Sequence, residues 1–348
     1  MKTNNVFRYA VLVGMFLAMV ASVYAQANRS GTAAASELLI PVGTRGIALG
    51  SSTLSTAAGI EAIYWNPAGL SRMKNSAEAM FSNMNYFADI GVMYGAVGAN
   101  FEGFGVIGLS IKSLSFGNII VTTDDDPDGL SGQTYSPTLV NFGLTYSRAL
   151  TDVISVGVTA TLVSEQIARV SSTGFAFSVG IQYSHLAGIN GLGLGVALKN
   201  IGPQMSFDGS GLLQAAEVTD ANRPPQYYQV QAASYDLPSS MEIGLSYEGN
   251  VGEKANFQLN GLFINNNLGV DEYRVGGELS YALSGLQLFG RGGYTLAPKA
   301  DKDKYLYGAT AGVGFKYAAT GIDITFDYAW RQVKYFGAQN VFSVILGF

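Results

Sequence analysis

The chain has 348 residues, 44 of them glycine, and a formal net charge of −5 at pH 7. It is 48% hydrophobic but only 13% charged, whereas about 25% of the residues in ordinary soluble domains are charged. The mild charge argues against nucleic-acid binding, and the absence of cysteine excludes disulfide bonds.

The N-terminal residues have the pattern of an export signal. Lys2 and Arg8 precede an apolar run over 11–23, which is followed by Val-Tyr-Ala ending at Ala25. This pattern predicts a signal peptide, residues 1–25, cleaved after Ala25. The apolar run is shorter than the roughly 20 residues that a membrane-spanning helix needs. We therefore expect an exported protein.

Beyond residue 76 the chain alternates between apolar and polar side chains. In IDITFDYAW, 322–330, every second residue from Ile322 to Trp330 is apolar or aromatic, and MEIGLSYE and EYRVGGELSY repeat this period of two. A period of two indicates β-strands with one apolar and one polar face. The predicted strands cover residues 77–86, 90–100, 104–113, 138–147, 153–163, 173–184, 191–200, 239–248, 254–264, 270–281, 285–295, 305–317, 321–330 and 339–348.

Fourteen strands of about ten residues, with aromatic residues near their ends, predict an all-β, antiparallel transmembrane β-barrel over 77–348. A β-sandwich, with the apolar faces as its core, is the alternative. The connections are long at one end, most of all 114–137 and 201–238, and short at the other. We expect the long connections to be extracellular and the barrel to lie in the outer membrane of a Gram-negative-type bacterium.

The segment 26–76 does not alternate, and the Asn66-Pro67 pair interrupts any long element within it. A barrel of fourteen strands is too wide for its own side chains to fill. We therefore predict that 26–76 plugs the lumen and buries Ile60, Ile63 and Trp65, together with Tyr64. The alternative is a periplasmic tail below the barrel.

Within this segment, GTRGIALGSSTLSTAAGIEAIYWNPAGLS, 43–71, resembles the N-terminal signature of the PorV/PorQ proteins, which are relatives of the FadL fatty-acid transporters. The residues that carry the resemblance are Arg45, Gly46, Trp65, Asn66, Pro67, Ala68 and Gly69. It implies a non-enzymatic component of type IX secretion that binds the C-terminal domains of secreted cargo and works beside a translocon and a sortase. The FadL relatives imply the alternative, uptake of a hydrophobic small molecule through a lateral opening in the wall.

Charged residues on the polar faces of the strands are expected to pair with one another or with the plug, because unpaired charges in a narrow lumen are costly. A transport path is the alternative. The residues are Glu242, Glu248, Glu272, Arg274, Glu278, Arg291, Lys316, Asp323 and Asp327.

The connection 201–238 contains Arg223, Tyr227 and Tyr228 in RPPQYYQ, and these form a candidate partner-binding loop. In the other long connection, DDDPDG, 124–129, has the spacing that opens a calcium loop, but Tyr135 occupies the position of the bidentate glutamate. We expect a solvated acidic loop there, and we predict neither a metal nor another cofactor.

Enzymatic chemistry has little support in the sequence. His185 is the only histidine and falls at a short turn, away from the rim where barrel hydrolases carry their catalytic groups. The run GLGLG, 191–195, lies in a predicted strand and opens no helix, so it does not predict a phosphate loop.

The last strand, NVFSVILGF, places Phe342, Val344, Leu346 and Phe348 in one apolar row. We expect this strand to pair with the first and so close the barrel. Its row resembles the C-terminal insertion signal of outer-membrane barrels, with Phe348 as the terminal aromatic residue.

Overall fold

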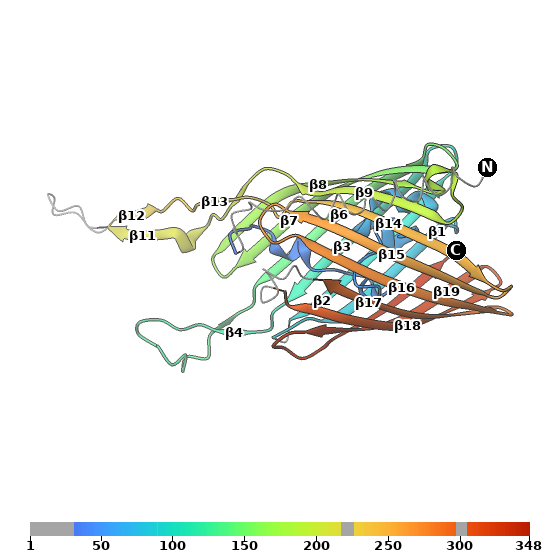
Figure 1. Cartoon of the computed structure of the whole chain (residues 1–348). Helices are drawn as coiled ribbons and strands as arrows, with labels where there is room; N and C mark the ends of the chain where they lie inside the picture. The colour runs from blue at the N-terminus through green and yellow to red at the C-terminus, as the bar shows by residue number, and fades with distance from the viewer. Residues whose placement is uncertain (1–30, 89, 217–225, 297–304) are drawn as a thin grey trace.

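The computed structural model describes residues 31–88, 90–216, 226–296 and 305–348. Fourteen antiparallel strands close into one barrel. Figure 1 shows this barrel from the side. The predicted fold class is confirmed. The predicted signal peptide, 1–25, lies outside the described residues.

Each barrel strand pairs with the next one along the wall, and β20 pairs with β1 over Glu78–Asn85 and Asn340–Gly347. The sheet of the wall is therefore closed on itself, which is the condition for a sheet to cross a membrane. The strands of the wall are β1 (Ala77–Asn85), β2 (Gly91–Phe101), β3 (Gly105–Ser115), β6 (Thr138–Ala149), β7 (Ile154–Ile167), β8 (Val170–Tyr183), β9 (Leu192–Ile201), β14 (Ser240–Val251), β15 (Ala255–Asn266), β16 (Glu272–Leu283), β17 (Leu286–Leu296), β18 (Tyr307–Ala319), β19 (Ile322–Val333) and β20 (Gln339–Gly347).

The two faces of the wall are assigned as the alternation predicts. On β19, Phe326 is 42% exposed on the outer face, whereas its neighbour Asp327 is 6% exposed and points inward. On β14, Met241 is exposed and Glu242 is buried. The inward side chains are buried because a second segment of the chain occupies the lumen.

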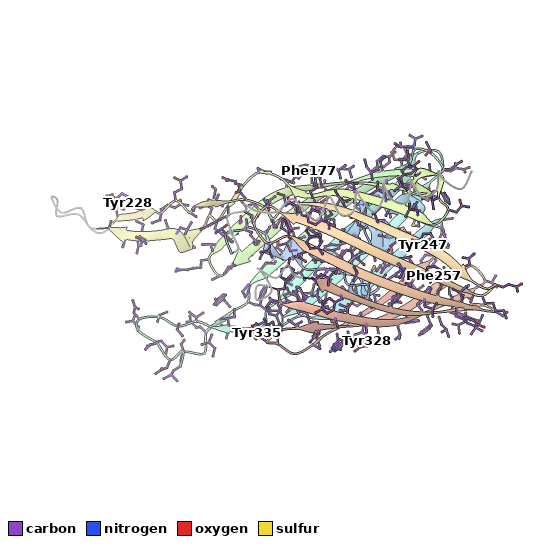
Figure 2. The ribbon with its side chains drawn as sticks, viewed as in Figure 1. Phe177, Tyr228, Tyr247, Phe257, Tyr328 and Tyr335 are labelled. Atoms are coloured by element: carbon purple, nitrogen blue, oxygen red, sulfur yellow. The ribbon has the colours of Figure 1, made fainter. Side chains whose placement is uncertain are left out.

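Aromatic side chains lie on the outer face toward both ends of the barrel (Figure 2). Tyr247 and Phe257, from the neighbouring strands β14 and β15, have ring centroids 6.0 Å apart. Tyr335 lies at the opposite end of the wall. Such rings suit the two membrane–water interfaces, where an apolar body and a polar edge are both accommodated.

Residues 31–76 enter the barrel ahead of β1 and pack against its inner face. Their short helices lie within the ring of strands in Figure 1. None of the helices in the described part of the chain is long and apolar enough to cross a membrane. The helices are the 3₁₀ helix η1 (Ser36–Leu39), α2 (Thr44–Ala48), η2 (Gly59–Glu61), α3 (Ala62–Trp65) and η3 (Pro67–Arg72).

The long connections contain strands that the alternation did not reveal. Each strand is two to four residues long, too short for a period of two to be recognised. The pairs are β4 (Ile119–Ile120) with β5 (Thr134–Tyr135), β10 (Met205–Ser206) with β13 (Ser234–Tyr235), and β11 (Leu213–Ala216) with β12 (Gln226–Gln229). In Figure 1 the connections that hold β4 and β11–β12 extend away from one end of the barrel, which we call the long-connection end; the opposite end is the short-turn end.

Candidate functional site

The plug, which is the described segment 31–76, is anchored to the wall by buried ion pairs. Arg45 of α2 has its Nε atom 3.0 Å from an Oε2 oxygen of Glu278, and its Nη2 atom donates to Gln258 at 3.1 Å. Arg291 bonds the same Glu278 oxygen at 2.5 Å and also pairs with Asp327. The network therefore joins α2 to β15, β16, β17 and β19.

The remaining ion pairs of the wall follow the expectation that charged residues facing the lumen pair with one another. The structure pairs eight of the nine charged residues named from the sequence. Glu248, the ninth, is exposed at the short-turn end of β14. The pairs not yet described are Lys199 with Glu242 at 3.2 Å, Arg274 with Glu272 at 2.6 Å and Lys316 with Asp323 at 2.7 Å. Lys199 is a partner that the sequence analysis did not name.

The Asn-Pro-Ala-Gly part of the motif is a second anchor. The Nδ2 atom of Asn66 donates to the carbonyl oxygens of Leu54 at 2.9 Å and of Ile181, in β8, at 3.2 Å. Its Oδ1 atom accepts from the N–H of Ala68 at 3.2 Å and caps η3, where Pro67 supplies the first residue. One amide thus starts a helix and ties it to the wall.

Glycines make this close packing possible. A Cβ atom on Gly46 would overlap the indole of Trp65, and one on Gly69 would overlap the carbonyl oxygen of Ala57. On the wall, a Cβ atom on Gly157 would overlap the backbone of Pro67. All seven motif residues therefore hold the plug together or hold it against the wall.

Glu61 is a buried carboxyl group in the plug. Burial raises its pKa to about 7, and the charges of Asp327 and Glu278 act in the same direction, while Arg45 and Arg291 oppose them. When Glu61 is protonated, the two positive charges of Arg45 and Arg291 balance the two negative charges of Glu278 and Asp327. The ionised form adds one uncompensated negative charge to the lumen.

Between the plug and the long-connection end lies a cavity of about 680 Å³. This volume lies within the range of small-molecule sites, about 300–1,000 Å³. Its walls combine apolar or aromatic side chains with cationic groups. They include Leu38, Tyr64, Trp65, Tyr94 and Leu114 on the apolar side and Lys112, Lys199, Arg274 and Arg331 among the cations.

Tyr64 lies at the boundary between the cavity and the plug. The Nζ atoms of Lys112 and Lys199 are 5.1 Å and 5.3 Å from the centroid of its ring, and both lysines are less than 10% exposed. Such distances allow attraction between each ammonium group and the ring face. The phenol hydroxyl donates to the carbonyl oxygen of Leu38 at 3.3 Å. Tyr64 therefore joins α3, η1 and two wall strands.

The long-connection side of the cavity is bordered by a second aromatic and cationic group. The hydroxyl groups of Tyr86 and Tyr307 are 2.8 Å apart. The guanidinium of Arg331 lies 4.0 Å from the ring centroid of Tyr307, and its Nε atom donates to Gln339 at 2.7 Å. These contacts connect β18, β19 and β20 to the residue that follows β1.

A groove of about 600 Å³ lies on the outer face of the wall. It crosses β20, β1, β2, β3 and β6, and its apolar border includes Phe81, Leu109 and Phe142. Ser110 of β3 and Gly143 of β6 pair directly and line both this groove and the lumen cavity. Only small side chains therefore separate the two spaces at this position, although the strand pairing is continuous there.

The other residues selected from the sequence lie apart from the cavity. Tyr227 and Tyr228 are exposed on β12, and Figure 2 shows Tyr228 far from the wall; Arg223 lies outside the described residues. Phe342 and Phe348 are exposed, and β20, which also contains Val344 and Leu346, forms the seam with β1. The backbone of Phe348 bonds Ala77, its N–H donating at 2.9 Å.

The acidic loop and the lone histidine show no link to the cavity. The carboxylate of Asp126 accepts from the backbone N–H groups of Leu130 at 2.8 Å and Ser131 at 2.7 Å, so it caps a turn. No group of three or more potential metal ligands occurs within the described residues. His185 lies in a turn at the short-turn end, with a φ of 54°.

The sequence analysis did not select Lys112, Lys199, Glu37 or Glu165. A signal was available for Lys112, because in GVIGLSIKSLS it shares its face with Ser110 and Leu114. The two glutamates gave no comparable signal, since their importance comes from a contact between segments 128 positions apart.

No family model matches the chain, and a search of curated proteins gives no match. The solved structures that share its fold include three channels or transporters. The CymD monoaromatic hydrocarbon channel is 13% identical, with a TM-score of 0.56 over 89% of this chain and 98% of that chain. The P. putida toluene transporter TodX is 12% identical, with a TM-score of 0.54 over 87% and 97%. The Ralstonia pickettii toluene transporter TbuX is 12% identical, with a TM-score of 0.52 over 87% and 96%.

At these identities the likeness concerns the fold. The fold that this chain shares with them is the closed antiparallel β-barrel, which here has fourteen strands. The barrel fold that the sequence resemblance implied is thereby confirmed. The PorV/PorQ part receives no support from these structures.

Proposed function

We propose that this protein is a non-enzymatic channel for a hydrophobic small molecule that crosses the outer membrane. The observation that carries the proposal is the lumen cavity, which shares Ser110 and Gly143 with a groove on the membrane face. The alternative derived from the sequence, FadL-like uptake, is therefore preferred to the secretion role. The names of the matched structures, hydrocarbon channel and toluene transporter, also favour it.

The proposed route begins at the long-connection end, which we take to be extracellular. A molecule enters the cavity of about 680 Å³ and meets the plug below it. The anchored plug blocks the direct way through the barrel. Movement between β3 and β6 at Ser110 and Gly143 then gives access to the groove, where Phe81, Leu109 and Phe142 offer an apolar surface continuous with the membrane.

A substitution at Gly143 tests this route. A Cβ atom there would lie 2.5 Å from the Oγ atom of Ser110, so Gly143→Val fills the shared position. We expect it to reduce entry of a hydrophobic fluorescent naphthylamine into cells several-fold. The control is Gly261→Val on β15, where a Cβ atom meets nothing within 4 Å. Equal entry through both folded variants would contradict the route.

Surface-protein handling is a second candidate, and the protruding strands favour it. β11 and β12 form an arm with Leu213, Tyr227 and Tyr228 exposed. Exposed tyrosines provide rigid contact area at protein interfaces. In this alternative the arm binds the C-terminal domain of a secreted cargo, beside a type IX translocon and a sortase. The C-terminal row ending at Phe348 is proposed as the insertion signal under either function.

A further inference from the structure

Residues 31–43, which we call the latch segment, form one side of the lumen cavity and are held mainly by the wall. The N–H of Ala34 donates to the carbonyl oxygen of Asp236 at 3.0 Å. The Nζ atom of Lys112 donates to the carbonyl oxygens of Glu37 at 2.7 Å and Ile40 at 3.2 Å. The only regular structure here before Thr44 is η1, four residues long. The segment is therefore held by these contacts and by the packing of Ala34, Ala35 and Leu38 against apolar residues of β7 and β8.

One contact joins two carboxyl groups. Glu37 of the latch segment and Glu165 of β7 are 1% and 7% exposed, and the Oε2 atom of each is buried without a hydrogen-bond partner. The charge of Glu165 acts on Glu37, so a hydrogen bond between the two carboxyl groups is the one that would satisfy both oxygens. Two carboxyl groups can form such a bond only when one of them carries a proton. When the side-chain amide of Asn141 is oriented so that its oxygen and its nitrogen both have suitable partners, the nitrogen donates to Oε1 of Glu37 at 3.1 Å.

We propose that Glu37 and Glu165 form a proton-operated latch, which holds residues 31–43 against the wall while the proton is shared and releases them when it is lost. The reason is electrostatic: two ionised carboxylates within one buried site repel each other, and in the part of the chain that the structure describes Lys112 is the cation that acts on Glu37. The latch is a conformational device that goes beyond the proposed channel function.

The charges around Glu37 come from three strands. β7 supplies Glu165 and β3 supplies Lys112. β9 supplies Lys199, which lies over the ring of Tyr64 and whose charge acts on Lys112. β6 contributes only the neutral Asn141. The carboxylate of Asp236, next to Ala34, already accepts from Gln204 at 2.8 Å. One ionised carboxylate therefore balances Lys112, and a second has no partner.

The transition should fall near neutral pH. The pKa of Glu37 is raised to about 7, first by burial and then by the charge of Glu165, although a backbone hydrogen bond and Lys112 lower it. Below that pH the pair keeps its proton and the latch segment stays in contact with β7. Above it, the second carboxylate forms and the contact becomes repulsive.

The chain contains no cysteine, so a single introduced thiol can report the position of the latch segment. Ala34→Cys places the thiol at a buried position, and Ser36→Cys places it at an exposed one. At each pH, the labelling rate of Ala34→Cys is divided by that of Ser36→Cys. This ratio removes the effect of thiol ionisation on the labelling rate. We expect this ratio to rise at least tenfold between pH 5.5 and pH 8.5 in the full-length barrel. A ratio that does not change with pH overturns the proposal.

Two further variants identify the groups that titrate. Glu37→Gln keeps a hydrogen-bond donor without a titratable charge, so the ratio should stay low at both pH values. Glu165→Gln removes the titratable group on the wall, so the ratio should again stay low at both pH values. If Glu37→Gln does not assemble, the result for Glu165→Gln tests the proposal. Glu61→Gln removes a plug carboxyl from a different network and should leave the rise intact. A full rise in the two latch variants, or its loss in Glu61→Gln, places the switch elsewhere and overturns the proposal.

Discussion

Asn66 of the plug and Gly180 of β8 lie so close that a Cβ atom on the glycine would overlap the Oδ1 atom of the asparagine. The same asparagine donates to the carbonyl oxygen of Ile181, the next residue of the strand. The absence of a side chain at position 180 is thus what lets the plug reach the wall there.

Gly180→Ala should therefore displace Asn66 and lower the free energy of unfolding by about 1–3 kcal/mol, the usual cost of overpacking a buried site. Urea unfolding in lipid vesicles measures the change. Gly261→Ala is the matched control, since its Cβ atom would meet nothing within 4 Å. If both alanine variants unfold at the same urea concentration as the wild type, this contact does not hold the plug.

The two faces of the wall should differ in their tolerance of charge. Phe326→Arg places a cation on the lipid face in mid-strand and should lower the free energy of unfolding by about 2–4 kcal/mol. Thr325→Arg faces the lumen and should cost less, because Asp323 and Asp327 lie on the same face of β19. Urea titrations of the two variants in the same vesicles provide the comparison. Equal losses would contradict the assignment of the faces.

The stability of the barrel should decrease from acid to neutral pH because of Glu61. Burial raises the pKa of this carboxyl from 4.5 to about 7 in the folded protein. An acid with a raised pKa contributes its full stability below about pH 4.5 and loses it as the pH passes 7. The shift corresponds to a loss on the order of 3 kcal/mol.

Glu61→Gln isolates this contribution. The difference in the free energy of unfolding between wild type and variant should change between pH 5 and pH 8.5, with the wild type losing more. Subtraction at each pH removes the effect of other titrating groups, including Glu37. A constant difference would mean that Glu61 keeps one protonation state throughout.

Removal of residues 205–234 distinguishes the two candidate functions. The deletion takes away β10, β11, β12 and the first residue of β13 without removing any residue of a wall strand. Under the channel proposal, the trimmed barrel should still assemble, keep its protein partners and change the entry of the hydrophobic tracer. Under the adaptor alternative, it should assemble and lose secreted cargo in pull-downs, with tracer entry unchanged. Heat-modifiable migration in gels confirms that each sample contains a folded barrel.

The wall could be predicted from the sequence because its information is local. The alternation of apolar and polar side chains over about ten residues predicts a strand and also which of its faces points outward, as for Phe326 and Asp327. Even β1 and β2, where NMNYFADIGVMYG alternates poorly, were placed within one residue of their observed bounds. The expected pairing of lumen charges also followed from one simple rule, that a buried ion needs a partner.

The arrangement of the cavity could not be predicted in this way. Arg45 and Glu278 are 233 positions apart, and no periodicity links them. The contact between Glu37 and Glu165 likewise depends on where the plug enters the lumen. The absence of alternation over 26–76 predicted the plug, but the roles of Arg45 to Gly69 in holding it became visible only once Gly157 and Gly180 were seen to leave room for them.

The seam between β1 and β20 has a consequence for the order of assembly. Its two strands are separated by more than 250 residues, so the closing contacts have the highest sequence separation in the wall and are expected to form late. The plug already lies ahead of β1 in the chain, and its anchors reach β8, β16 and β19. Once β1 and β20 have paired, helices with bulky residues such as Trp65 can no longer pass between the strands. The plug must therefore take its position while the sheet is still open, and closure of the barrel then encloses it.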